Sequence, residues 1–187
     1  MNHRFMLTLI VMACLVVLVG SGCSMAVRKV GSVATGKKAS YQSVSGNEAF
    51  LADHKTAIVK SFSTDMGRDT VPFLCSLRSE AISQLKASNL FADVAESISP
   101  SSPAAQLFIT GRIIDYEAGS KLKRIVTLGG EAFMIVRFEI RDSSGKLLAS
   151  FNARGFVKDS VTGGDIKDAI PLICKGLVQY IKEHKSR

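Results

Sequence analysis

The sequence predicts an α/β (α+β) two-layer sandwich: a mixed, largely antiparallel sheet of about five strands with two helices on one face. Two segments repeat apolar residues at the three- and four-residue steps of a helix, and three long segments alternate apolar and polar residues as strands do. The chain has 187 residues, of which 47% are hydrophobic and 21% charged. This composition suits one ordinary domain and excludes a disordered chain.

The chain begins with a secretory signal. Basic residues precede an apolar run from Phe5 to Val19, and small residues then lead to Cys23. Residues 1–22 resemble a bacterial lipoprotein signal peptide, which implies that Cys23 receives lipid and becomes the new N-terminus. Lipid at Cys23 anchors the protein to a membrane without embedding it. The alternative is an uncleaved inner-membrane anchor, because residues 5–22 approach the roughly 20 residues of a spanning helix.

The mature chain divides into a tether and one domain. Residues 23–50 are rich in Gly, Ser, Ala and Lys without a sustained apolar period, which predicts a lipidated N-terminus and a flexible tether. Residues 51–187 are expected to form a single globular periplasmic domain. It begins with a strand over 56–62, a helix over 71–87 with Pro72 in its first turn, and a strand over 91–97. These three elements predict a right-handed crossover.

Three longer strands and a helix complete the domain. The strands are expected over 106–117, 131–141 and 146–158, with a hairpin turn at 142–145 between the last two. Their alternation gives the sheet one apolar face and one face in contact with water. The final helix is expected over 165–183, where Pro171 should kink or shorten its start.

Basic residues occupy alternating strand positions that could share the helix-free sheet face. These are Arg112, Arg137, Arg141, Arg154 and Lys158. The chain has 24 Lys and Arg against 16 Asp and Glu, a formal charge of +8, and a positive surface attracts polyanions. Secretion argues against nucleic acid and leaves lipid headgroups, peptidoglycan carboxylates and acidic protein surfaces as partners. The alternative is a solvated face with ordinary surface charges.

The cysteines and the motifs typical of catalysis do not indicate a reactive site. Cys75 and Cys174 lie near the apolar stripes of the two helices and could form a disulfide in an oxidising compartment, although two buried free thiols are favoured. Residues 31–38 imitate a phosphate-binding loop but lack its Ser or Thr. Asp115 and Glu117 share one strand face, where a solvated strand end is favoured over acid and base work. We therefore expect no enzyme, no metal and no cofactor.

The stretch from Leu107 to Gly155 resembles a known group of bacterial lipoproteins. The residues that carry the resemblance are Ile109, Gly111, the run from Asp115 to Ser120, Arg124, Leu128 to Gly130, and Arg141 to Lys146. They are similar to domain of unknown function family 4410, and more distantly to the curli secretion-channel lipoprotein and the N-terminal domain of the translocation protein TolB. The resemblance implies a mixed sheet with helices and a role in envelope assembly, secretion or trafficking, without catalytic residues.

Anchor, fold and charge together predict a non-enzymatic, lipid-anchored protein on the periplasmic face of the outer membrane, with the inner membrane as the alternative. The expected partner is an envelope protein or peptidoglycan. Its binding surface is expected to combine the basic sheet face with the loop that contains Gly119, Arg124, Gly129 and Gly130. The second hypothesis is an oligomeric structural subunit of a secretion or envelope complex, in which copies of this chain associate.

Overall fold

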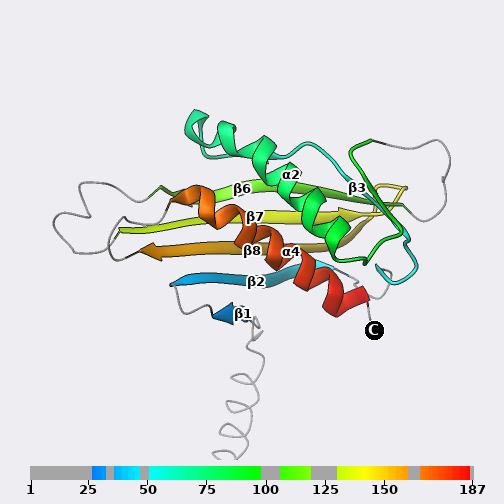
Figure 1. Ribbon diagram of the computed structural model, residues 1–187. Coiled ribbons are helices and arrows are strands. Elements are labelled where there is room, and N and C mark those ends of the chain that lie inside the picture. The colour runs from blue at the N-terminus through cyan, green and yellow to red at the C-terminus, as the bar shows by residue number, and fades with distance from the viewer. Residues whose placement is uncertain are drawn as a thin grey trace, which may run out of the picture.

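The computed structural model describes residues 27–32, 36–46, 51–97, 106–118, 130–159 and 165–185. Within these ranges the chain forms one eight-stranded mixed sheet with two α-helices on one face (Figure 1). The predicted two-layer α/β sandwich is confirmed, although the sheet has more strands than the five expected. In the same ranges, neither helix combines the length and the apolar character needed to cross a membrane.

The sheet runs in the order β1-β2-β8-β7-β6-β3-β5, and the short strand β4 pairs with β6. In that order the bounds are β1 (Val27–Ser32), β2 (Lys37–Gly46), β8 (Leu147–Asp159), β7 (Gly130–Arg141), β6 (Gln106–Glu117), β3 (Thr56–Val59) and β5 (Asp93–Ala95), and β4 is Ser63–Thr64. Neighbours from β1 to β6 are antiparallel. The pairs of β3 with β5 and β6, and of β4 with β6, are parallel.

The helices lie close to where the apolar spacing places them. Helix α2 (Val71–Ala87) has the predicted bounds, with Pro72 in its first turn, and it connects the parallel strands β3 and β5 as a crossover helix does. Helix α4 (Ala169–Lys185) follows a 3-10 turn, η3 (Ile166–Asp168). The Asp165 side chain accepts a hydrogen bond from the Lys167 backbone N–H at 2.9 Å and begins this turn. Pro171 lies in the first turn of α4, where its missing N–H breaks no helical hydrogen bond.

The predicted tether over 23–50 is wrong for the residues of β1 and β2. Strand β2 pairs with β8 from Lys37 opposite Val157 to Gly46 opposite Ala149, and β1 adds outside it. The sequence hides this pairing because Tyr41, 4% exposed, is one of few large apolar side chains in β2, and Val44 is 44% exposed. Backbone hydrogen bonds to β8 stabilise an otherwise polar strand, so the folded part begins before residue 51.

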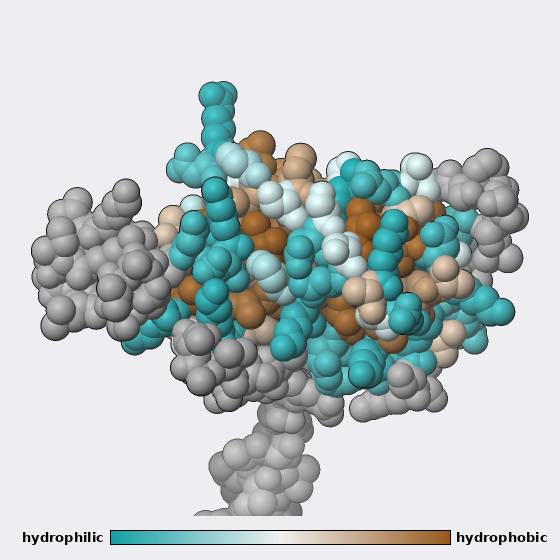
Figure 2. Space-filling view, in the orientation of Figure 1, coloured by the Kyte–Doolittle hydropathy of each residue, from teal (hydrophilic) through white to brown (hydrophobic). Residues whose placement is uncertain are grey.

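The core lies between the sheet and the helices. Helix α4 crosses β8 and β2, and α2 packs beside α4 (Figure 1). The inward side chains of β6, β7 and β8 include Ile113, Phe138 and Phe151, each fully buried. Figure 2 shows the outer surface of the helix-bearing side, where polar residues surround smaller apolar areas. The opposite face of the sheet carries no helix among the described residues, and it holds the candidate site.

Candidate functional site

Every second residue of β6, β7 and β8 points to the helix-free face. On β6, Ile109 and Ile113 point into the core, so Thr110 and Arg112 point away from it. The ladder then sets Arg112 opposite Arg137 on β7, and Arg137 opposite Asn152 on β8. These residues form one row across the sheet.

The predicted basic residues are brought to this face. Arg154 lies opposite Ile135, Lys158 opposite Glu131, and Arg141 opposite Phe108, all at positions that alternate with core residues. Period-two alternation over long strands therefore predicted which face these side chains occupy. It did not predict how each of them is paired.

Two of the arginines are held by carboxylates. Arg141 Nη2 lies 2.8 Å from Glu139 Oε2, and its Nη1 donates to the Gly145 carbonyl oxygen at 2.9 Å. Arg112 Nη1 lies 3.5 Å from Asp65 Oδ2, which is a long contact between exposed groups. The charge of Arg141 is thus largely compensated, and that of Arg112 only weakly.

Arg137 and Arg154 have no carboxylate partner in the described part of the chain. Arg137 Nε donates to the neutral Asn152 Oδ1 at 3.1 Å. The Arg154 guanidinium lies over the Phe133 ring, 4.7 Å from its centroid, and 5.8 Å from that of Phe156. The ring faces attract the cation without neutralising its charge. The face therefore combines uncompensated guanidinium groups with half-buried aromatic rings.

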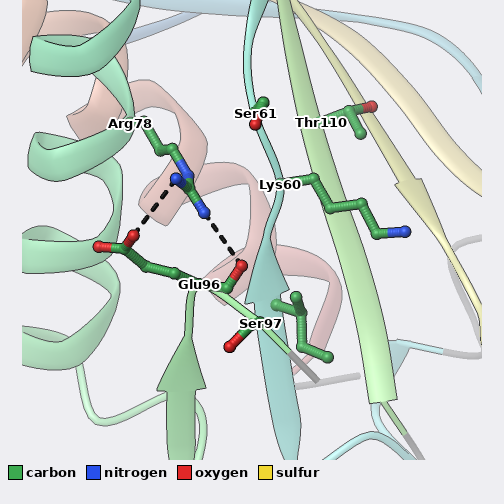
Figure 3. A pocket seen from close by; sticks show the side chains of 7 residues that line it. Lys60, Ser61, Arg78, Glu96, Ser97 and Thr110 are labelled. Atoms are coloured by element: carbon green, nitrogen blue, oxygen red, sulfur yellow. Dashed lines mark hydrogen bonds and ion pairs between the residues drawn. The ribbon is translucent and has the colours of Figure 1, made fainter. Parts of the chain in front are cut away.

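Two adjoining cavities indent this side of the sheet near β3 and β4. The larger, of about 400 Å³, is lined by Ile58, Lys60, Ser61, Arg78, Glu96, Ser97 and Thr110 (Figure 3). The smaller, of about 150 Å³, is lined by Ser61, Ser63, Thr110, Gly111, Arg112, Arg137 and Glu139. Ser61 and Thr110 line both, so the two cavities adjoin, and together they are called the groove.

Arg78 forms one wall of the larger cavity and connects α2 to the sheet. Its Nε donates to the Val59 carbonyl oxygen at 3.1 Å, and its Nη2 donates to the Glu96 carbonyl oxygen at 3.0 Å. Its Nη1 also lies 3.2 Å from Glu96 Oε2. In Figure 3 Lys60 points away from Arg78 over β6, and its ammonium lies 4.4 Å from the Phe108 ring centroid. Arg78 is thus bound within the protein, whereas Lys60 extends along the groove.

Several predicted site residues fall outside this arrangement. Cys23, Gly119, Arg124 and Gly129 lie outside the described residues. Gly130 is the first residue of β7, opposite Asp159. The expected contribution of the loop over 119–129 to the surface stays a prediction.

The possible disulfide between Cys75 and Cys174 is not formed: both thiols are free, as the sequence favours, although only Cys174 is buried. Cys75 is exposed on the outer side of α2, whereas Cys174 is buried on α4 with its Sγ 3.7 Å from the Leu77 carbonyl oxygen. The two side chains therefore occupy different environments although their helices pack together. Burial raises the pKa of the Cys174 thiol, so this group stays protonated.

Asp115 and Glu117 do not line the groove, and the carboxylates that do, Glu96 and Glu139, are each paired with an arginine. Asp115 and Glu117 share the helix-free face as expected, and Asp115 Oδ1 accepts a hydrogen bond from the Tyr116 backbone N–H at 2.8 Å. Burial, followed by the charges of Asp69 and Asp165, raises the pKa of the Tyr116 phenol. Among the described residues, no three His, Cys, Asp or Glu side chains are placed to hold a metal ion.

The sequence analysis did not identify the hydroxyl side chains that line the groove, which are Ser61, Ser63 and Thr110. Thr110 precedes Arg112 by two residues, so alternation could have placed it on the same face. Ser61 and Ser63 gave no such signal, because β4 has only two residues and its pairing with β6 is a tertiary contact. They flank Phe62, which is buried against Gly111.

The described architecture defines a class of protein by fold: a mixed sheet covered on one face by two helices. No model of a known protein family matches the chain, and no curated protein sequence matches it. The resemblance to domain of unknown function family 4410 therefore stays a prediction.

Several solved structures match this chain at low sequence identity. The PelC dodecamer from Paraburkholderia phytofirmans is 24% identical with a TM-score of 0.51, and the match covers 75% of this chain and 95% of that one. Protein XCC0632 from Xanthomonas campestris, of family DUF330, is 14% identical with a TM-score of 0.43, covering 75% and 86%. A minor lipoprotein from Acinetobacter baumannii is 14% identical with a TM-score of 0.36, covering 70% and 92%. At this identity the PelC likeness establishes the fold.

Proposed function

We propose that this protein is a non-enzymatic binding or accessory module of the cell envelope, anchored by lipid on Cys23 to the periplasmic face of the outer membrane. The inner membrane is the alternative location. The apolar run of residues 5–19 and the small residues before Cys23 support the anchor. A protein delivered in this way meets envelope proteins, peptidoglycan and lipid headgroups.

The observation that carries the binding role is the charge of the helix-free face. Arg137 and Arg154 form no ion pair among the described residues, and Arg112 has only a long contact to Asp65. Guanidinium groups that lack an internal carboxylate can pair with an external anion at little cost to the fold. The half-buried rings of Phe133 and Phe156 add apolar contact area beside Arg154. An acidic surface on an envelope protein or peptidoglycan suits this combination.

Labelling cells with a fatty-acid analogue tests the anchor. Wild type and Cys75→Ser are expected to incorporate the label, and Cys23→Ser is expected to lose it, because only Cys23 follows the small-residue box. Label retained on Cys23→Ser contradicts lipidation at this position.

Crosslinking in intact cells tests the binding face. The double variant Arg137→Glu, Arg154→Glu is expected to lose most crosslinked partner, because its charge then repels an acidic surface. The matched control is Lys175→Glu, Lys182→Glu, which makes the same charge change at exposed positions of α4. Equal capture by both double variants contradicts a role for the helix-free face.

The second candidate is an oligomeric subunit of an envelope or secretion complex. It is supported by the dodecamer of the PelC structure and by β1, which has no strand on its outer side among the described residues. An edge strand can pair with a strand of another copy. Light scattering of the full chain in neutral detergent separates the two candidates, because a ring has a mass many times that of the adaptor monomer.

A further inference from the structure

The smaller cavity of the groove brings two arginines together. Arg112 and Arg137 are direct partners in the antiparallel ladder of β6 and β7, and both side chains line this cavity of about 150 Å³. Like charges directly opposite each other destabilise a sheet pair. Such a pair is stable when an anion lies between the two cations.

The protein supplies little negative charge to this pair. Asp65 reaches only Arg112, at 3.5 Å, and the Glu139 carboxylate at the cavity wall is paired with Arg141 at 2.8 Å. Arg137 donates its Nε to Asn152 and has no carboxylate partner among the described residues. The terminal nitrogens of the Arg137 guanidinium are therefore available to a ligand.

Hydroxyl groups surround the same space. Ser61, Ser63 and Thr110 line the cavity, and none of their hydroxyls forms a hydrogen bond with the described part of the chain. Ser61 and Ser63 approach from the segment around β4, Thr110 and Arg112 from β6, and Arg137 from β7. Donors thus converge from three strands on one small volume.

We propose that this cavity binds a phosphoryl group. A phosphate monoester carries a charge of about −1.5 to −2, which matches two guanidinium groups, and its oxygens accept hydrogen bonds from several directions. A single carboxylate is planar and is satisfied by one guanidinium fork. The cavity holds one such group, and the adjoining space of about 400 Å³ beside Lys60 and Ser97 holds the polar body to which the phosphate is attached.

This proposal rests on the proposed function, because it also takes the helix-free face as the binding face, and it adds the chemical class of the ligand. The phosphoryl group can belong to a soluble phosphate ester or to a phospholipid headgroup, and two probes separate these sources. Glycerol 3-phosphate, a monoester, represents the first source. Glycerophosphoglycerol, a phosphodiester with a single negative charge, represents the headgroup of phosphatidylglycerol without its acyl chains, so the charge match to two guanidinium groups favours the monoester. Each is titrated calorimetrically into the full chain in a neutral detergent, with acetate as the carboxylate comparison.

The expected result is saturable binding of one of the two phosphates, with the tighter probe identifying the source, and weaker binding of acetate. Arg137→Gln and Arg112→Gln are each expected to weaken binding about tenfold, because a charge-assisted hydrogen bond is lost. Asp65→Asn is expected to strengthen binding, because its carboxylate competes with the ligand for Arg112. The control Lys175→Gln removes one positive charge from α4, on the helix-bearing face, and should leave affinity unchanged.

The proposal is overturned if neither phosphate binds saturably, if acetate binds as tightly, or if both arginine variants retain wild-type affinity. Arg112 is exposed, so Arg112→Gln keeps the test valid if Arg137→Gln fails to fold. The titration requires neither the lipid anchor nor a cellular partner. If neither phosphate binds in the titration but the protein still crosslinks to its partner in cells, only the phosphoryl site is rejected. If a phosphate binds but no partner is crosslinked in cells, only the proposed partner is rejected.

Discussion

The ring of Phe151 on β8 stacks on the ring of Tyr180 on α4, with centroids 3.8 Å apart and 14° between the planes. Tyr41 of β2 lies edge-on to both rings, at 6.4 Å and 5.4 Å between centroids. Its hydroxyl also donates to Glu183 Oε2 at 2.5 Å. These three rings connect an early strand, a late strand and the C-terminal helix, so this cluster holds β2 to the rest of the fold.

Phe151→Ala is expected to lower the free energy of unfolding by about 3–5 kcal/mol, because the side chain is fully buried and leaves a cavity beneath α4. Phe151→Leu keeps most of the volume and should cost less than about 1.5 kcal/mol. Urea unfolding followed by far-UV circular dichroism measures both. Val71→Ala, at a position 50% exposed, serves as the control and should change the value by no more than about 0.5 kcal/mol. Equal costs for Ala and Leu at position 151 contradict the packing described.

Gly155→Ala is expected to destabilise the protein by about 1–3 kcal/mol through overpacking. A Cβ built on Gly155 meets the Ala169 carbonyl oxygen, a backbone atom, well inside normal contact distance. The start of α4 must then move away from β8. Thermal unfolding measures the loss, and Gly145→Ala provides a contrast because its Cβ meets nothing and only the left-handed backbone, with φ +85°, is strained. If Gly155→Ala unfolds like wild type, α4 does not lie so close to β8.

Asp142 should make the hairpin turn pH-dependent. Its Oδ1 accepts hydrogen bonds from the Ser144 hydroxyl at 2.6 Å and the Ser144 N–H at 2.9 Å. The Ser144 side chain, then the backbone N–H groups of Lys146 and Ser144, hold the pKa of this carboxyl below its usual 3.8. A lowered pKa in the folded state adds stability above pH 3.8, and this stability is lost as the pH falls through the lowered pKa.

The urea midpoint of Asp142→Ala is therefore expected to lie below that of wild type at pH 6, and the difference should shrink as the pH falls below 3.8. Ser144→Ala should show the same trend more weakly, since the backbone donors remain. A difference that grows in acid contradicts the lowered pKa.

Maleimide labelling of the folded full chain is expected to modify Cys75 and to spare Cys174. Cys75 is exposed, whereas Cys174 is buried and its thiol, with a raised pKa, offers little reactive thiolate. Peptide masses locate the label, and Cys75→Ser should remove it. Denaturation without a reductant should expose Cys174 to labelling. Failure of both cysteines to react after denaturation, followed by reaction after reduction, contradicts the free thiols.

Much of the sandwich follows from local pattern. The apolar spacing of α2 and the alternation of β6, β7 and β8 each repeat over 12 or more residues, so one face of every element is defined without tertiary information. The basic face was predictable for the same reason. Strands β1 and β2 were not, because their polar sequence is stabilised by pairing with β8, a contact more than 100 residues away.

The groove was less predictable than the face on which it lies. It requires β4 to place Ser63 beside Arg112 through a parallel pairing of two residues, which leaves no period to detect. The free state of the cysteines depends on the rotation of each helix about its axis: Cys75 and Cys174 both lie near apolar stripes, yet only Cys174 points inward. The spacing of apolar residues identifies the buried stripe of a helix, but it does not decide whether a residue at the border of that stripe is buried or exposed.

If Cys23 carries the proposed lipid, the early start of β1 limits the distance between the domain and the membrane. Val27 follows Cys23 by four residues, and four extended residues span at most about 14 Å, against roughly 100 Å for the 28 residues first expected as a tether. A chain acylated at Cys23 therefore keeps β1, the outermost strand of its sheet, within about 14 Å of the bilayer surface. With the proposed anchor on Cys23, any molecule that the domain binds therefore has to approach the lipid surface, because so short a connection leaves the domain little freedom to move away from it.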